Sequence, residues 1–253
     1  MPADTPAHDV RIAVQELATR AWDYRRSEAR PLHHYFIRRM RTRPWRKAFA
    51  DSSGKSLRRL PALISSIALA RALGPLWGNE KNVGILMPPT MGGALANIAT
   101  AMAGKVSVNL NFTAGKSGMT SALEQAGIKS IITSRTFIEK ATLELPEDAK
   151  IIYLEDVLPN IGFTTRLLAV FAAFCLPIRL IEKLCGAVSR PSVEETATII
   201  FSSGSTGEPK GVMLSHYNVA ANAEAVGQAI TVNDSDKLLG ILPLFHSFGY
   251  MSL

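Results

Sequence analysis

Short apolar runs alternate with longer, helix-like segments through the middle of the chain. Such alternation predicts βαβ units that build a parallel sheet. Hydrophobicity is continuous along 83–87 and 197–201, as in strands that are covered on both faces. The sequence therefore predicts an α/β fold with mostly parallel sheets and flanking helices. The strands are predicted at 82–87, 106–109, 129–133 and 150–154, and the helices between them at 91–103 and 116–126.

The region before these strands has a different pattern. A short helix is predicted at Leu32–Met40. A hairpin follows, with Lys47–Asp51 as its first strand and a turn at 52–55. A long apolar helix is predicted from Pro61 to about Leu76, because proline is tolerated in a first turn, where its missing N–H would have no partner.

A stretch rich in glycine and hydroxyl residues follows the apolar run at 197–201. Glycine lets the backbone approach a ligand, while N–H groups, hydroxyls and the cation of Lys210 can bind anionic oxygens. A phosphate-binding loop is one interpretation, and a flexible polar surface loop is the other. The spacing differs from that of a P-loop NTPase, because Pro209 precedes the lysine and apolar residues 212–214 follow it. Lys210 is therefore predicted to lead into a strand.

Several segments of the chain are similar to motifs of one superfamily. Phe201–Gly211 resembles the signature loop of the adenylate-forming superfamily, which includes acyl-CoA synthetases, luciferases and nonribosomal peptide adenylation domains. Leu242–Gly249 resembles the next motif, and Asn82–Thr90 resembles the strand that opens the first subdomain. Asn109–Gly115 and Ile131–Lys140 look most like acyl-acyl carrier protein synthetases, including the ligase half of 2-acylglycerophosphoethanolamine acyltransferase.

The resemblance implies a reaction. In that superfamily a carboxylate attacks the α-phosphate of ATP, giving an acyl-adenylate and pyrophosphate, and a thiol then takes the acyl group. ATP and Mg²⁺ are the implied cofactors, because a carboxylate and a polyphosphate repel each other. Lys210 is implied to be catalytic as well as phosphate-binding. The residues implied to hold the phosphates are Ser202, Ser203, Gly204, Ser205, Thr206, Gly207 and Lys210.

The second motif supplies the other implied site residues. His246 is implied to be catalytic and to lie beside the carboxylate that is activated. Together with His246, Phe248 and Gly249 are the implied substrate-binding residues, because they would shape the acyl tunnel. No metal-ligating residue is implied. Between the two motifs, Ser215 is placed to cap a helix, and His216 is interpreted as a helix-start residue without a chemical role.

The resemblance leads to a specific functional prediction: a fatty acid ligase that passes the acyl group to acyl carrier protein, in phospholipid reacylation. A long-chain acyl-CoA ligase is the alternative, since both make the same adenylate. Residues 1–30 are predicted to be a polar basic leader or linker, and 31–253 a truncated N-terminal portion of the adenylation domain. The superfamily's adenine, ribose and C-terminal lysine motifs would lie beyond Leu253. We therefore expect a fragment that is inactive alone, and a non-catalytic nucleotide-binding fragment is a third interpretation.

The formal net charge of +7 is unevenly distributed. Residues 1–60 hold 14 Lys and Arg against 6 Asp and Glu, while the rest of the chain holds 14 against 15. Such a basic region can bind anionic lipid or an acidic carrier protein, or it can be a solvated helix face. Nucleic acid is not an expected partner, because zinc-ligand spacing and an aromatic RNA-binding platform are both missing.

The compartment is predicted from the cysteines and the N-terminus. Cys175 and Cys185 are interpreted as free thiols, and the first residues lack a signal-peptide pattern. A cytoplasmic protein is therefore expected, with peripheral association with the cytoplasmic face of the membrane as a further expectation.

One apolar segment does not follow the strand and helix alternation. Residues 167–178 are uncharged, with Arg166 before them and Arg179 and Lys183 after them. Twelve residues cannot cross a bilayer, which takes about 20. Two interpretations stay open, namely a helix that lies in a membrane interface and a helix that packs on the protein's own sheet or lines the acyl pocket.

Overall fold

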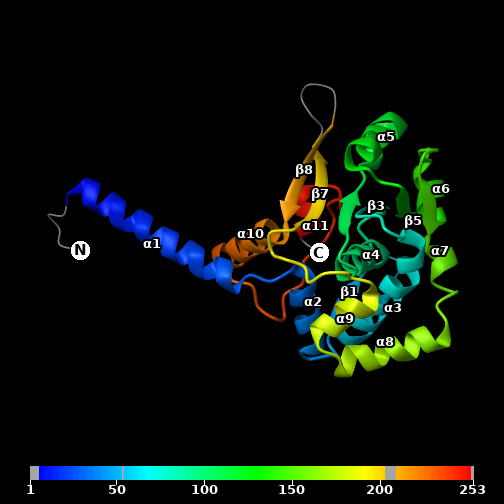
Figure 1. The fold of residues 1–253 in the computed structure, drawn as a ribbon, viewed down its shortest axis with the longest axis horizontal. Coiled ribbons are helices and arrows are strands. Elements are labelled where there is room, and N and C mark those ends of the chain that lie inside the picture. Colours follow the sequence, from blue (N-terminus) through cyan, green and yellow to red (C-terminus); the bar gives the residue numbers. More distant parts are fainter. Residues whose placement is uncertain (1–5, 53, 203–208, 252–253) are drawn as a thin grey trace.

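The computed structural model describes residues 6–52, 54–202 and 209–251. Its centre is a six-stranded sheet with the strand order β6-β5-β3-β4-β7-β8 (Figure 1). Five of the strands are parallel, and β8 runs antiparallel to β7 at the edge. The predicted α/β fold with a mostly parallel sheet is confirmed. The bounds are β3 Asn82–Leu86, β4 Val106–Asn109, β5 Ser130–Thr133, β6 Lys150–Tyr153, β7 Thr196–Ser202 and β8 Lys210–Ser215.

Burial of these strands follows the hydrophobic pattern of the sequence. All residues of β4 and β5 are buried, and so are most residues of β3 and β7. Strand β8 is exposed along most of its length, as expected for an edge strand. The continuous hydrophobicity at 83–87 and 197–201 thus correctly indicated two buried strands, and β4 and β5 are buried as well.

Helices cover both faces of the sheet. Helices α3 and α4 share one hydrophobic core with α2, α8 and α9, whereas α5 packs on the opposite face and α6 joins that second core. The hairpin predicted near residue 50 is formed by β1 and β2. The remaining bounds are α1 Ala7–Glu28, α2 Leu32–Arg41, β1 Lys47–Ala50, β2 Ser56–Arg58, α3 Arg59–Trp77, α4 Met91–Met102, η1 Phe112–Ala114, α5 Gly115–Ala126, α6 Arg135–Ala141, α7 Leu154–Val157, α8 Phe163–Cys175, α9 Ile178–Cys185, α10 His216–Ala229 and α11 Ser247–Met251.

Helix α3 is the central helix of the first core. It is long and apolar enough to cross a membrane by length and composition, and more than half of its most apolar window is buried inside the fold. Leu63, Ile67, Leu73 and Trp77 are almost completely buried along it. Its hydrophobicity therefore reflects packing against α2, α4 and α8.

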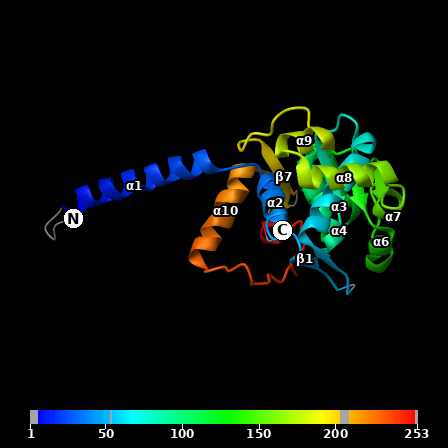
Figure 2. The same ribbon diagram turned by 90° about the horizontal axis from the view of Figure 1, so that it is seen from below.

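Helix α1 extends away from the body of the protein (Figures 1 and 2). Its C-terminal part contacts α10, where Trp22 packs edge-to-face on Tyr217 and Arg25 donates a hydrogen bond to Gln228 at 2.8 Å. From the sequence we expected only a polar segment here. That residues 1–30 serve as a leader or linker stays a prediction.

The apolar segment at 167–178 is not one helix, and that prediction is wrong. Helix α8 ends at Cys175, Leu176 is extended, and Pro177 caps the start of α9. Proline cannot continue a helix and favours an extended residue before it, which explains the break. Ala169, Ala172 and Ala173 are fully buried, so one face of α8 packs on the protein's own core through α3.

A buried polar network joins α2 and α9. Glu182 accepts hydrogen bonds from Nε2 of His33 at 2.7 Å and from Nε2 of His34 at 2.5 Å. The three side chains are also close enough to share a metal ion, but these separations are those of hydrogen bonds. Burial raises the pKa of Glu182, and the hydrogen bonds from the two histidines outweigh it, so the carboxyl pKa lies below its ordinary value.

His216 connects this network to α10. Its Nδ1 accepts a hydrogen bond from the backbone N–H of Leu32 at 3.2 Å, and its ring lies 6.0 Å from that of His33. Burial, together with the charges of His33 and His34, lowers the pKa of His216 to about 4. Because the unfolded ring takes up a proton at a higher pH than the folded ring, acidification must favour unfolding.

We predict that the free energy of unfolding decreases between neutral pH and pH 5, and that His216→Asn removes part of this decrease. The stability that His216 contributes is present above its unfolded pKa and is lost as the pH falls toward about 4. At about pH 5 the loss from this ring is about 2 kcal/mol. Asparagine keeps an acceptor for the N–H of Leu32 but does not titrate.

Urea unfolding of the parent and of His216→Asn at both pH values tests this prediction. His8→Asn is the matched control, because His8 is exposed in α1. Equal pH dependence in the parent and His216→Asn would contradict the assignment.

Candidate functional site

The predicted phosphate loop is carried by a hairpin. Strands β7 and β8 pair antiparallel with Ser202 opposite Lys210, and Ser202 Oγ donates a hydrogen bond to the carbonyl of Lys210 at 3.4 Å. Lys210 is exposed and begins β8, as predicted. The predicted phosphate-binding residues Ser203, Gly204, Ser205, Thr206 and Gly207 lie outside the described residues. The structure therefore places the two ends of this loop.

Close packing fixes the base of the hairpin. A Cβ atom on Gly211 would lie 3.1 Å from the ring of Phe201 and 3.2 Å from Ile199, so glycine lets β8 approach β7. Gln125, at the end of α5, donates a hydrogen bond to the carbonyl of Pro209 at 3.0 Å. Ser215 then caps α10 by accepting from the N–H of Asn218 at 3.1 Å, as predicted. Lys210 is thus held between two fixed points.

The loop leaves from the carboxyl end of β7, which is the edge where ligands bind in open parallel sheets. The carboxyl end of β4 is fixed at the same edge by a buried pair of amides. Asn97 donates a hydrogen bond to Asn109 at 3.0 Å, and Asn109 donates one to Asn97 at 2.8 Å. Asn111 accepts from the N–H of Thr113 at 2.9 Å and begins the short helix η1. These residues position the loops around the site.

The second motif reaches this edge through apolar contacts. Leu244 is buried and lies against Gly93, where a Cβ atom would come within 2.7 Å of the leucine side chain. Phe245 packs edge-to-face on Phe112, with ring centroids 5.0 Å apart, and Phe112 packs in the same way on Phe137. The motif is therefore attached to the loop after β4, which in turn packs on α6.

His246 lies next to these anchors and is exposed. Its backbone N–H donates to the carbonyl of Pro243 at 3.0 Å, and its Nδ1 accepts from the N–H of Phe248 at 3.3 Å. An accepting Nδ1 places the proton of the neutral ring on Nε2. The ring can therefore donate one hydrogen bond to an anionic oxygen.

Phe248 and Gly249 differ in their surroundings. Phe248 is 55% exposed at the start of α11. Gly249 is buried, and a Cβ atom there would lie 2.1 Å from the carbonyl oxygen of Pro243 and 2.9 Å from that of Leu242. Glycine is thus required for α11 to fold back on the segment that carries His246. A role for both residues in an acyl tunnel stays a prediction.

One cavity is lined by residues of the second motif, and another is lined by Tyr250 and Met251, which follow it directly. One of about 150 Å³ is lined by Asp51, Thr90, Leu244 and Gly249, among others. Another of about 330 Å³ lies between α2, α4, α10 and α11 and is mainly apolar, with Phe36, Ile98, Val219 and Met251 in its wall. The motif that carries His246 therefore borders on space that small ligands could occupy.

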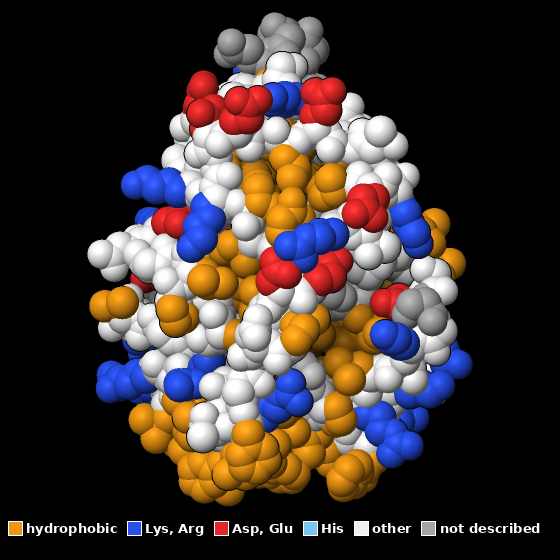
Figure 3. Space-filling model, turned by 90° about the vertical axis from the view of Figure 1, so that its right-hand side faces the viewer, with side chains coloured by type: hydrophobic (Ala, Val, Ile, Leu, Met, Phe, Trp, Pro, Cys, Tyr) orange, Lys and Arg blue, Asp and Glu red, His pale blue; other side chains and the backbone are white. Residues whose placement is uncertain are grey.

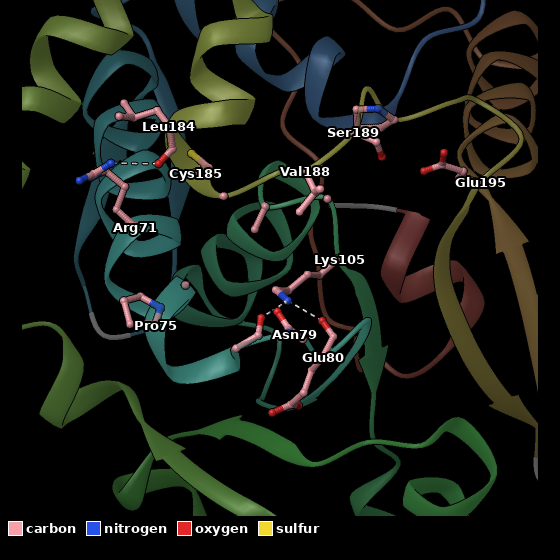
Figure 4. A pocket seen from close by; sticks show the side chains of 16 residues that line it. Arg71, Pro75, Asn79, Glu80, Lys105, Leu184, Cys185, Val188, Ser189 and Glu195 are labelled. Atoms are coloured by element: carbon pink, nitrogen blue, oxygen red, sulfur yellow. Dashed lines mark hydrogen bonds between the residues drawn. The ribbon is translucent and has the colours of Figure 1, made fainter.

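A cavity of about 490 Å³ lies at the opposite edge of the sheet, where the strands begin (Figure 4). Lys105, which precedes β4, donates to the carbonyls of Gly78 and Glu80, and burial lowers its pKa. Arg71 donates to the carbonyl of Leu184 at 3.0 Å. Both cations are thus bound to the backbone, and none of the predicted site residues lines this cavity.

We predict that Gly249→Ala destabilises the protein and displaces His246. The methyl group cannot be accommodated without moving the backbone of 242–243. Overpacking of this kind costs about 1–3 kcal/mol. Thermal unfolding measures the effect.

Gly240→Ala is the matched control, because a Cβ atom at Gly240 meets nothing within 4 Å. Its free energy of unfolding should stay within about 0.5 kcal/mol of the parent value. Equal stabilities of the two variants would show that the close contact at Gly249 is not important.

Comparison with known proteins identifies the family. The family model of AMP-binding enzymes matches residues 41–253. The mitochondrial medium-chain acyl-CoA ligase of Bos taurus is 27% identical over 192 residues, which are 66% of this chain and 31% of that protein.

Solved structures share the fold. The O-succinylbenzoate coenzyme A synthetase of Bacillus subtilis, in complex with AMP, matches with a TM-score of 0.66 and 21% identity, over 88% of this chain and 52% of that one. The fatty acid AMP ligase of Legionella pneumophila matches with a TM-score of 0.67 and 18% identity, over 87% and 36%. The chain spans less than a third of the curated relatives' length and about half of the synthetase. Because the family model covers most of its length, the chain belongs to the family of AMP-binding, adenylate-forming enzymes.

Proposed function

We propose that the chain is part of an ATP-dependent fatty acid ligase that forms an acyl-adenylate and passes the acyl group to acyl carrier protein, in phospholipid reacylation. The observation that carries this proposal is the β7–β8 hairpin. It presents the loop between Ser202 and Lys210 at the carboxyl edge of a parallel sheet. Family membership supports the adenylation step.

The loop would bind the polyphosphate of ATP. An exposed lysine at the loop's base suits this anion, because its charge strengthens binding as negative charge moves onto the departing pyrophosphate. The backbone of Lys210 is fixed in β8, so the point from which its exposed side chain extends has a defined position. Mg²⁺ is held largely by substrate phosphates in such sites, and we assign no protein ligand to it.

His246 would orient the carboxylate of the fatty acid. Its Nε2–H is available for an anionic oxygen because Nδ1 already accepts from Phe248. The aromatic contact of Phe245 with Phe112 holds the neighbouring backbone in place. The mainly apolar cavity of about 330 Å³ beside α11 favours an apolar tail over a polar acid.

Two alternatives remain for the whole protein. A long-chain acyl-CoA ligase is favoured by relatives that carry that name, including one from Saccharomyces cerevisiae that is 43% identical over 60 residues. The resemblance of 109–115 and 131–140 to acyl-acyl carrier protein synthetases favours the carrier protein. A non-catalytic nucleotide-binding fragment is the other alternative. Assays with acyl carrier protein and with coenzyme A as the acceptor thiol distinguish the two ligases.

We predict that Lys210→Ala, made in the full-length gene product, slows fatty acid-dependent pyrophosphate exchange by about 30- to 1,000-fold. The loss of one preorganised charge contact removes about 2–4 kcal/mol of transition-state stabilisation. Fatty acid binding should change less, because the lysine is assigned to the phosphates.

Lys237→Ala is the matched control, since Lys237 is also exposed but lies outside both motifs. Wild-type exchange in Lys210→Ala would refute the assignment of the loop. Exchange that is absent from the parent enzyme with every fatty acid tested would instead favour the non-catalytic alternative.

A further inference from the structure

Helix α8 has an apolar face that points away from the core. Its small residues, Ala169, Ala172 and Ala173, pack inward, as described above. Its large side chains recur every three or four residues and therefore form one stripe along the helix. The exposed fractions in this stripe are 78% for Phe163, 58% for Leu167, 53% for Phe171 and 59% for Phe174.

The stripe belongs to a wider apolar area. Figure 3 shows hydrophobic side chains gathered at the lower end of the molecule, where Figure 1 places α8, with Lys and Arg side chains above them. The Asp and Glu side chains drawn on this face lie higher. Large contiguous apolar areas of this kind mark interaction surfaces.

The charged residues that lie close to the stripe in the sequence are basic. Residues 157–181 contain no Asp or Glu. Arg166, Arg179 and Lys183 are exposed beside the two ends of α8. An apolar stripe with cations at both ends is complementary to an anionic lipid surface, in which the acyl region lies beneath charged head groups.

Part of the backbone at the C-terminal end of α8 is bound by a side chain of the protein itself. Arg41, from α2, donates to the carbonyls of Ala173 at 2.8 Å, Ala172 at 2.9 Å and Leu176 at 2.6 Å. The last carbonyls of a helix have no partner within the helix and normally bind water. Arg41 therefore reduces the number of carbonyls at this helix end that need water as a partner.

We propose that α8 lies in the interface of a membrane that contains anionic phospholipid, parallel to its surface. Phe163, Leu167, Phe171 and Phe174 enter the head-group and acyl boundary, while Arg179 and Lys183 contact the head groups. The helix has 13 residues, which is too short to cross a bilayer. This binding goes beyond the proposed ligase activity and does not depend on it.

A second copy of the chain fits this surface less well. A twofold contact through α8 would bring cations of both copies close together, and like charges across an interface oppose association. Anionic lipid neutralises them instead. The arrangement of charge thus selects lipid over self-association.

Flotation of the chain with vesicles tests the proposal. We expect the parent to float with vesicles that contain phosphatidylglycerol at low salt, and to float less as salt increases. Phe171→Asp/Phe174→Asp should weaken binding by roughly tenfold or more, because two exposed rings no longer enter the bilayer. Arg179→Gln/Lys183→Gln should weaken it by roughly fivefold for each charge removed.

Leu238→Asp/Leu239→Asp is the matched control. These leucines are 74% and 80% exposed and lie in the segment between α10 and α11. This control variant should float like the parent. A parent that stays in solution at low salt, or a Phe171→Asp/Phe174→Asp variant that floats as well as the parent, overturns the proposal. So does a parent that dimerises through α8 and does not bind vesicles.

A second measurement tests the proposal if the Phe171→Asp/Phe174→Asp variant fails to fold. In Phe174→Trp the indole replaces a ring that is already exposed. Vesicles with brominated acyl chains should quench the added fluorescence and shift its emission to the blue. Emission that vesicles leave unchanged overturns the proposal.

Discussion

Burial of the middle strands on both faces of the sheet determines where the candidate site lies. Val108, Ile131 and Ile132 are completely buried in β4 and β5, and each such side chain stabilises the fold by about 1.5–3 kcal/mol. Helices must therefore cover both faces, and the chain crosses over the sheet between parallel strands. The loops at one edge are then free to vary, and both motifs are found there. The site depends on a core that contains none of its residues.

The sequence predicted this core well because strand hydrophobicity is a local property. It also placed Lys210 at a strand start and Ser215 at a helix cap, since both follow from neighbouring residue types. The prediction of one helix over 167–178 was wrong, because the apolar pattern was followed across Pro177. Proline ended the helix as its covalent geometry requires. Pro177 thus indicated the end of the helix in the sequence, but the prediction followed the hydrophobic pattern instead.

Other features of the structure could not be predicted from sequence. His33 and Glu182 are 149 positions apart, and only tertiary packing brings them together. The motif around His246 was recognised by its pattern, but the reason for Gly249 is the approach of the Pro243 carbonyl. Phe245 meets Phe112 across the same edge, so two motifs that were recognised separately form one structure. Patterns indicate which residues matter, and packing explains why.

The basic excess of the first 60 residues serves more than one purpose. Arg39, Arg43, Arg46 and Arg59 all bind Asp234, and Arg41 binds the end of α8. Part of this charge is therefore engaged within the fold, although four arginines that share one carboxylate keep an excess of positive charge. Arg41 bears on both interpretations of the apolar segment, namely a helix that packs on the protein and a helix that lies in a membrane interface. Buried alanines pack α8 on the core and Arg41 binds carbonyls near its end, so the helix is held by the fold while its opposite face exposes aromatic side chains.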